Sequence, residues 1–122
     1  MRKLRLDWQG YFAVDDKTIK GKVEDRAGVF KLSMPQKDGT LKPILTGQAA
    51  SVRTRLVDFV NSGGYPEIKE QIKKGGCQFR FAYLYTKEDL DAAERALYKR
   101  YTPKLNDKSA VPEAEDVEVN VN

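Results

Sequence analysis

The sequence predicts a small mixed α/β domain, and three observations support this. Apolar residues alternate at period two near the N-terminus, after Gly28 and again in residues 77–85, which is typical of strands. Between these stretches the apolar spacing changes to that of amphipathic helices. The length of 122 residues suits one domain with a modest core. The expected order is one strand, a hairpin, two helices, a strand and a final helix.

The N-terminal residues 1–27 are expected to be an extension that carries a strand. Leu4, Leu6 and Trp8 lie on one side of an extended segment, and Phe12 continues that side. The polar stretch that follows, residues 15–27, is typical of a loop, with a short strand around Ile19 as an alternative.

A β-hairpin is expected after Gly28. Phe30, Leu32 and Met34 alternate with their neighbours and indicate a strand. The Asp38-Gly39 pair is a hairpin turn signal, and the second strand returns at residues 44–47.

Two helices follow the hairpin. Residues 49–61 place Val52, Leu56 and Phe59 on one helical face, and the Ser-Gly-Gly of residues 62–64 is expected to end that helix. A shorter helix over residues 66–74 buries Ile68 and Ile72.

The last elements are a strand and a capped helix. Residues 77–85 place two phenylalanines, two tyrosines including Tyr85, and a cysteine on one face. Thr86 is expected to cap a helix over residues 87–101, with Asp89 completing a capping box. The acidic residues 107–122 are expected to be a disordered tail.

Glu94 is an unexpected residue on the last helix. At about 100° per residue, it falls within the apolar stripe formed by Leu90, Ala93, Leu97 and Tyr101. A buried carboxylate is costly unless it is paired or binds a cation. Glu94 therefore either forms a salt bridge with an arginine from another element or ligates Mg²⁺.

Three further residues are candidates for binding a phosphate. Arg55 flanks the apolar face of its helix and either pairs with Glu94 or grips a phosphate. Arg53 is the alternative, because the spacing does not separate the two. Asn106 follows the last helix and either bonds the local backbone or positions a phosphate.

The composition excludes several chemistries. Histidine is absent, which removes imidazole-dependent nucleophiles and metal sites. Cys77 is the single cysteine, so no internal disulfide forms, and the cytoplasm is the expected compartment. The sequence has neither an apolar run long enough for a membrane span nor a signal peptide.

The charge distribution favours a polyanionic partner. The chain carries +4 and residues 107–122 carry −4, which leaves +8 on residues 1–106. Nucleic acid is the first candidate partner, although surface lysines that only keep the domain soluble explain the charge equally well. The candidate contacts are Arg53, Lys69, Lys73, Lys74 and Lys104.

The order of Arg55, Glu94 and Asn106 after the hairpin resembles that of the GIY-YIG nuclease superfamily. Gly28-Val29-Phe30 stands where that family has Gly-Ile-Tyr, and Leu45-Thr46-Gly47 stands where it has Tyr-Ile-Gly. Arg55 follows eight residues after Gly47, and Glu94 lies on the later helix. Residues 103–106 match a Pro-x-x-Asn motif. The resemblance covers residues 28–106, which form the expected nuclease-like domain.

The resemblance implies a fold and a reaction. The fold would be a central three-stranded antiparallel sheet flanked by helices, here with the extra N-terminal strand. The reaction would be endonucleolytic hydrolysis of DNA with one Mg²⁺ or Mn²⁺ ion. Glu94 would hold the metal, Arg55 would stabilise the phosphate charge, and Asn106 would hold the substrate or the closing loop.

The chain departs from the family at both signature tyrosines, which are Phe30 and Leu45 here. Neither side chain has a hydroxyl to order water or accept a proton. Tyr83, Tyr85 and Tyr98 are candidate substitutes, and core packing explains each of them as well. Phe59 occupies the position of the family's frequent histidine.

Three functions therefore remain. The first is a DNA endonuclease, weakened by the loss of the two hydroxyls. The alternatives are an inactive nucleic-acid-binding module and a protein-interaction module on the same fold. A partner protein or a homodimer would supply substrate specificity.

Overall fold

The computed structural model describes residues 2–61, 65–112 and 117–121. Four helices and six strands lie within these residues. In chain order they are β1 Arg2–Arg5, β2 Gln9–Ala13, α1 Asp16–Lys22, β3 Gly28–Pro35, β4 Leu41–Ala49, α2 Val52–Asn61, α3 Pro66–Lys73, β5 Gln78–Tyr83, α4 Lys87–Tyr101 and β6 Val117–Asn120, with a short 3₁₀ turn at Lys108–Ala110.

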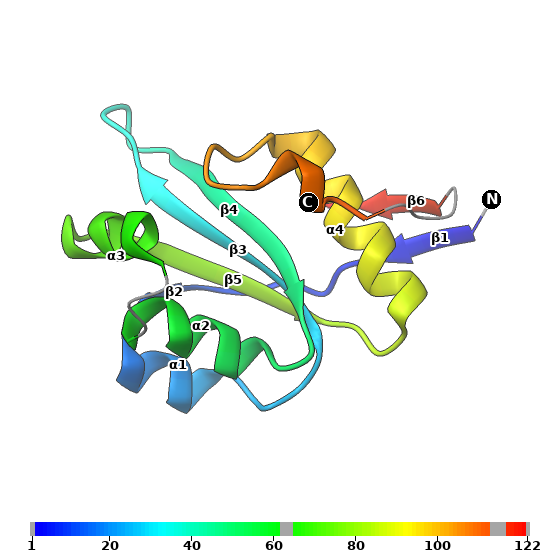
Figure 1. Ribbon diagram of the computed structural model, residues 1–122, viewed down its shortest axis with the longest axis horizontal. Coiled ribbons are helices and arrows are strands. Elements are labelled where there is room, and N and C mark those ends of the chain that lie inside the picture. Colours follow the sequence, from blue (N-terminus) through cyan, green and yellow to red (C-terminus); the bar gives the residue numbers. More distant parts are fainter. Residues whose placement is uncertain (1, 62–64, 113–116, 122) are drawn as a thin grey trace.

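The central sheet has four antiparallel strands in the order β2-β5-β3-β4 (Figure 1). Strands β3, β4 and β5 form the expected three-stranded sheet, and β2 is the expected extra N-terminal strand. The predicted fold class is therefore confirmed. Strand β4 is an edge strand, so one side of its backbone needs other partners.

Two apolar layers cover the sheet. On one face Ile19 of α1, Leu56 of α2 and Ile68 of α3 pack against Phe30 and Phe79. On the other face α4 and the separate β1–β6 pair pack against the sheet through a second cluster (Figure 1). Its buried members are Leu6, Val29, Ala82, Leu84, Leu90, Ala93, Leu97 and Val121.

The helices follow the predicted pattern closely, and the hairpin forms where it is expected, although its second strand, β4, runs over Leu41–Ala49 rather than residues 44–47. Helix α2 ends at Asn61, and α3 and α4 begin at the predicted residues. Thr86 caps α4, because its side chain accepts a hydrogen bond from the Asp89 amide. The glycines expected to end α2, at residues 63 and 64, lie outside the described residues.

The loop expected over residues 15–27 is wrong, because the chain forms α1 there. Asp15 caps this helix by accepting a hydrogen bond from the Thr18 amide, 2.7 Å away. Ile19 and Val23 lie one turn apart and are both almost fully buried. Packing of these two residues, rather than a long periodic pattern, stabilises the short helix.

The disorder expected for residues 107–122 is also wrong where the structure describes them. Strand β6 pairs in parallel with β1, and Leu4 stands opposite Val119. Val121 is buried in the cluster beneath α4. Valines at every second position, Val117, Val119 and Val121, give this acidic segment an apolar side that the charge count conceals.

A third correction concerns the strand predicted for residues 77–85. Strand β5 ends at Tyr83, and Tyr85 is 71% exposed, so it does not share the core face of Phe79 and Phe81. The domain boundaries at residues 28 and 107 stay a prediction. Among the described residues, no helix has the length and apolar character needed to cross a membrane.

Candidate active site

The outer edge of β4, which has no neighbouring strand, is hydrogen-bonded by side chains from α4 and from the loop that follows it. Every second residue of an edge strand points its backbone N–H and C=O away from the sheet. At Thr46 both groups bond the Asn106 side chain, each at 2.9 Å. At Gln48 the backbone N–H donates to Oε2 of Glu94 at 3.1 Å. Glu94 and Asn106 therefore take the place of a fifth strand at this edge.

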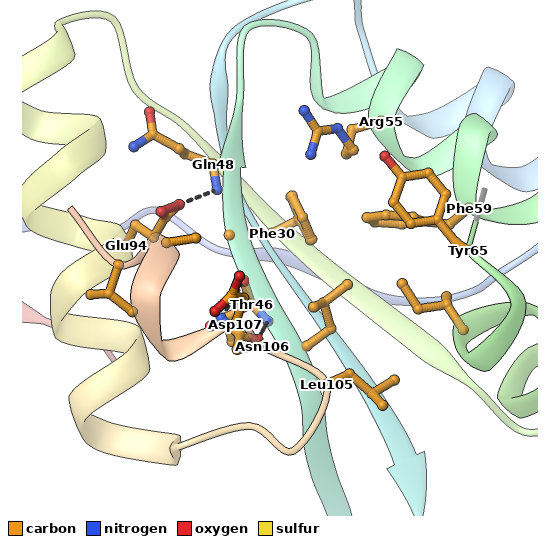
Figure 2. A pocket seen from close by; sticks show the side chains of 15 residues that line it. Phe30, Thr46, Gln48, Arg55, Phe59, Tyr65, Glu94, Leu105, Asn106 and Asp107 are labelled. Carbon is orange, nitrogen blue, oxygen red and sulfur yellow. Dashed lines mark hydrogen bonds between the residues drawn. The ribbon is translucent and has the colours of Figure 1, made fainter.

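A cavity of about 230 Å³ lies beside this edge. Its walls come from β3, β4, α2, α3, α4, the 3₁₀ turn and residues of the adjoining loops, and Figure 2 shows the side chains that line it. The residues that line it include Phe30, Leu45, Gln48, Arg55, Phe59, Tyr65, Glu94, Asn106 and Asp107.

Glu94 lies on one side of the cavity, with its carboxylate turned toward β4 (Figure 2). Ala93 and Leu97 anchor this part of α4 in the core. Burial raises the pKa of the Glu94 carboxyl above its ordinary 4.5, while the Gln48 amide and Arg55 act in the opposite direction. No salt bridge joins Glu94 to any arginine that the structure describes.

Arg55 lies on the opposite side of the cavity (Figure 2). Helix α2 places it there because Val52, Leu56 and Phe59 hold the other side of the helix in the core. The guanidinium makes no hydrogen bond or ion pair with another described residue. Arg53, the alternative from spacing, donates from Nε to the Val23 carbonyl at 2.7 Å and does not line the cavity.

Asn106 bonds the backbone of Thr46 through both polar atoms of its amide head. Oδ1 accepts from the Thr46 amide, and Nδ2 donates to the Thr46 carbonyl. Next to it, the Leu105 amide donates to the Ile44 carbonyl at 3.0 Å. Of the two roles expected for Asn106, this geometry favours holding the closing loop against β4.

Both positions of the missing signature tyrosines line the cavity. Phe30 is 3% exposed, and its ring packs over Gly47, where a β-carbon would come within 3.0 Å of it. The same ring meets Phe59 edge-on with centroids 5.5 Å apart. Leu45 packs against the same apolar cluster and is only partly buried.

Solved structures have a fold similar to that of this chain, whereas no family model and no curated protein sequence matches it. One is the GIY-YIG N-terminal endonuclease domain of UvrC from Thermotoga maritima bound to magnesium, its catalytic divalent cation. It has 21% identity and a TM-score of 0.57, and the match covers 73% of this chain and 96% of that domain. A tyrosine-to-phenylalanine mutant of that domain, also bound to its catalytic divalent cation, has 22% identity and a TM-score of 0.56 over 74% of this chain and 96% of that domain.

This chain has the GIY-YIG fold. The GIY-YIG fold brings together the two hairpin positions, the helix arginine and the later glutamate that the sequence motif separates by up to 64 residues (from Phe30 to Glu94). The functional roles of these residues remain proposals.

A tyrosine that the sequence does not mark also lies in the cavity. Tyr65 meets Phe59 edge-on, with ring centroids 4.9 Å apart. It stands between two helices, directly before Pro66, so no periodic pattern identifies it. The candidate substitutes do not line the cavity: Tyr83 accepts from the Glu24 amide, Tyr85 bonds Arg26, and Tyr98 lies elsewhere on α4.

The predicted basic contacts lie outside this cavity. Lys73, Lys74 and Lys104 are exposed, and Lys69 is partly buried on α3. Their role in nucleic-acid binding stays a prediction.

The donor chemistry of the site fits a hard divalent ion held by one carboxylate. Within the described residues no three acidic or cysteine side chains gather as a metal cage. Mg²⁺, however, is usually bound through one or two carboxylates, with water and phosphate oxygens completing the shell. One oxygen of Glu94 bonds the Gln48 amide, and the structure gives its other oxygen, Oε1, no partner among the described residues.

Proposed function

We propose that this protein is a metal-dependent endonuclease that hydrolyses phosphodiester bonds of DNA in the cavity beside β4. One observation carries the proposal. Glu94 and Arg55, an acid and a base from helices far apart in the chain, line the same cavity without forming a salt bridge with each other. A carboxylate and a guanidinium that share one cavity without pairing suit a metal cation and a phosphate that bind there together.

Glu94 would hold one Mg²⁺ or Mn²⁺ ion. That ion would neutralise charge on the phosphate and polarise its oxygens. The Gln48 amide fixes one carboxylate oxygen, which orients the side chain before the ion binds.

Arg55 would contact the phosphate from the other side of the cavity. Its planar guanidinium can donate two parallel hydrogen bonds to phosphate oxygens. Asn106 would act as a positioning residue, because it holds the closing loop on β4 next to Gln48.

Tyr65 would supply the hydroxyl that Phe30 and Leu45 lack. A hydroxyl at this place orders a water or accepts its proton, and such assistance is typically worth 10²- to 10⁴-fold in rate. The tyrosine-to-phenylalanine mutant of the similar domain is bound to its catalytic divalent cation. Metal binding in that domain therefore does not require this tyrosine hydroxyl, and we expect the same of metal binding at Glu94 in this chain.

A second candidate function is an inactive nucleic-acid-binding or protein-interaction module. The apolar Phe30 and Leu45 at the two motif positions favour it. Substrate specificity in either case would come from a partner protein or a homodimer. The buried single cysteine, with its pKa raised to about 11, suits a reducing cytoplasm.

Nicking of supercoiled plasmid in Mg²⁺ or Mn²⁺ tests the proposal. The wild type is expected to nick, Glu94→Ala to lose nicking, and Glu88→Ala, an exposed acid on the same helix, to retain it. Plasmid binding without nicking by all three proteins supports the inactive module. Equal nicking by wild type and Glu94→Ala contradicts the proposed metal ligand.

A further inference from the structure

Two cations lie side by side on the sheet face opposite Phe30. Lys31 of β3 and Arg80 of β5 are direct partners in the antiparallel register. Lys31 is only 4% exposed, and Arg80 is partly buried. Like charges directly opposite one another destabilise a sheet, and burial adds to the cost. Such a pair needs an explanation.

No carboxylate of the described residues forms an ion pair with either cation. Neither Lys31 nor Arg80 forms a salt bridge within the described residues. Their neighbours are aromatic: the Lys31 ammonium lies 5.2 Å from the Trp8 ring centroid and 4.7 Å from that of Tyr101. The Arg80 guanidinium lies 5.6 Å from Trp8 and 5.0 Å from Tyr11. Cation–π contacts offset part of the burial cost but leave the net charge in place.

Hydrogen-bonding groups on this face are also unsatisfied. Nε of Arg80 and Oγ of Ser33 are buried and have no hydrogen-bond partner among the residues that the structure describes. Ser33 lies two residues after Lys31 on β3, so both side chains project from the same face. Lys31 itself has one long bond, 3.5 Å to the Tyr101 hydroxyl. All three side chains can donate to an oxygen anion.

A cavity lies beside Arg80, and the exposed ring of Tyr11 lies near both cations. An open cavity of about 450 Å³ borders Arg80 and Trp8. Its one acidic side chain, Asp7, already pairs with Arg5 at 3.4 Å. Tyr11 is 41% exposed, which is high for a large apolar ring and leaves a surface for stacking.

We propose that this face is a second binding site, which takes single-stranded nucleic acid with a phosphate at Arg80, beside the buried charge of Lys31, and a base stacked on Tyr11. A basic groove combined with aromatic rings is the usual recognition surface for single strands. In a duplex the bases are stacked on one another, so Tyr11 would have no ring to contact. This site lies on the opposite side of the sheet from the Phe30 side chain and does not require cleavage.

Trp8 provides a direct signal, because it is the only tryptophan in the chain. In EDTA, a single-stranded DNA 12-mer is expected to quench its fluorescence and to bind at least tenfold more tightly than the matching duplex. Inorganic phosphate and a nucleoside monophosphate are titrated in parallel. Equal affinity for either of these shows a free-anion site and overturns the proposal, as does an absence of quenching by the 12-mer or tighter binding of the duplex.

Variants locate the binding. Arg80→Gln and Tyr11→Ala are each expected to weaken binding of the 12-mer by about tenfold or more. Lys42→Gln, an exposed lysine of β4, is the control and is expected to bind like the wild type. If Arg80→Gln and Tyr11→Ala both bind like Lys42→Gln, the proposed site is wrong. Because Arg80→Gln removes a like-charge contact, it is expected to melt no lower than the wild type, which separates lost binding from lost folding.

The outcome is independent of the nuclease proposal. The 12-mer is expected to quench the Trp8 fluorescence of Glu94→Ala as it does that of the wild type, because Glu94 does not border this site. Quenching without any nicking keeps the second site and rejects the endonuclease. Nicking without Trp8 quenching does the reverse.

Discussion

Tyr65 is the tyrosine whose side chain lines the cavity beside β4. The change Tyr65→Phe keeps the ring that packs against Phe59 and removes only the hydroxyl. We expect single-turnover cleavage to slow by roughly 10²-fold, the lower end of what proton-transfer assistance supplies, with the same thermal midpoint. Tyr98→Phe, which changes a tyrosine outside the cavity, should cleave at the wild-type rate. Wild-type cleavage by Tyr65→Phe would show that the hydroxyl has no role.

Lys31 is held in its charged form at a cost to stability. Burial, assisted by Arg80 and Arg100, lowers the pKa of Lys31 from 10.5 to about 8. Replacing a buried charge by an apolar side chain of similar volume is often stabilising. We therefore expect Lys31→Met to raise the free energy of unfolding at pH 7 by about 1 kcal/mol or more, while it weakens binding of the single strand.

The same residue predicts a pH dependence. Because the pKa is lower in the folded state than in the unfolded state, the unfolded chain binds more protons between pH 8 and pH 10.5. The wild type therefore gains stability relative to Lys31→Met as the pH rises through this window. Urea denaturation of both proteins at pH 7 and pH 10 should show the difference becoming smaller. A constant difference would mean that Lys31 titrates normally.

At the scale of the elements, β4 depends on a side chain to complete its hydrogen bonds. Asn106→Ala removes two 2.9 Å bonds and leaves the Thr46 amide and carbonyl without that partner. Unsatisfied part-buried groups cost about 1–3 kcal/mol, so we expect a loss of that size in urea denaturation. Asn61→Ala removes one exposed bond to Asp16 and should cost less than 0.5 kcal/mol. Equal losses of unfolding free energy in the two variants would show that the Asn106 side chain does not stabilise β4.

The elements that sequence reasoning predicts best are those with long periodic patterns and explicit caps. Helix α4 has both, since its apolar stripe spans several turns and Thr86 caps it. Helix α1 has seven residues, and only two buried positions, Ile19 within it and Val23 just after it, which are too few to establish a period. The apolar alternation of β6 is hard to recognise because acidic residues surround it. Local sequence patterns do not include the tertiary packing that stabilises both.

The candidate site was predictable where a motif marks it and not elsewhere. The order and spacing of Arg55, Glu94 and Asn106 predict a shared site. Helical spacing alone does not separate Arg55 from Arg53, and only the motif position after Gly47 favours Arg55. The presence of Tyr65 is not encoded in a local pattern, because it lies in a connection between two helices and its place results from how those helices pack on the sheet.

At the scale of the whole molecule, the two ends of the chain form one small sheet beneath α4 (Figure 1). Nε1 of Trp8 also donates to the Val121 carbonyl at 3.1 Å. Deleting residues 117–122 removes β6 and the buried Val121, whose burial is worth about 1.5–3 kcal/mol. We expect a thermal midpoint lower by roughly 5 °C or more and a red-shifted Trp8 emission. An unchanged midpoint would show that the acidic segment contributes nothing to the fold.

We expect Glu94 to hold a divalent ion at the edge of the sheet, opposite Arg55. Electron paramagnetic resonance of Mn²⁺ measures this binding directly, because it counts bound ions without requiring cleavage. One Mn²⁺ per chain should bind to the wild type and to Glu88→Gln, and none to Glu94→Gln at the same concentration. Equal Mn²⁺ binding by the wild type and Glu94→Gln would show that Glu94 is not the metal ligand.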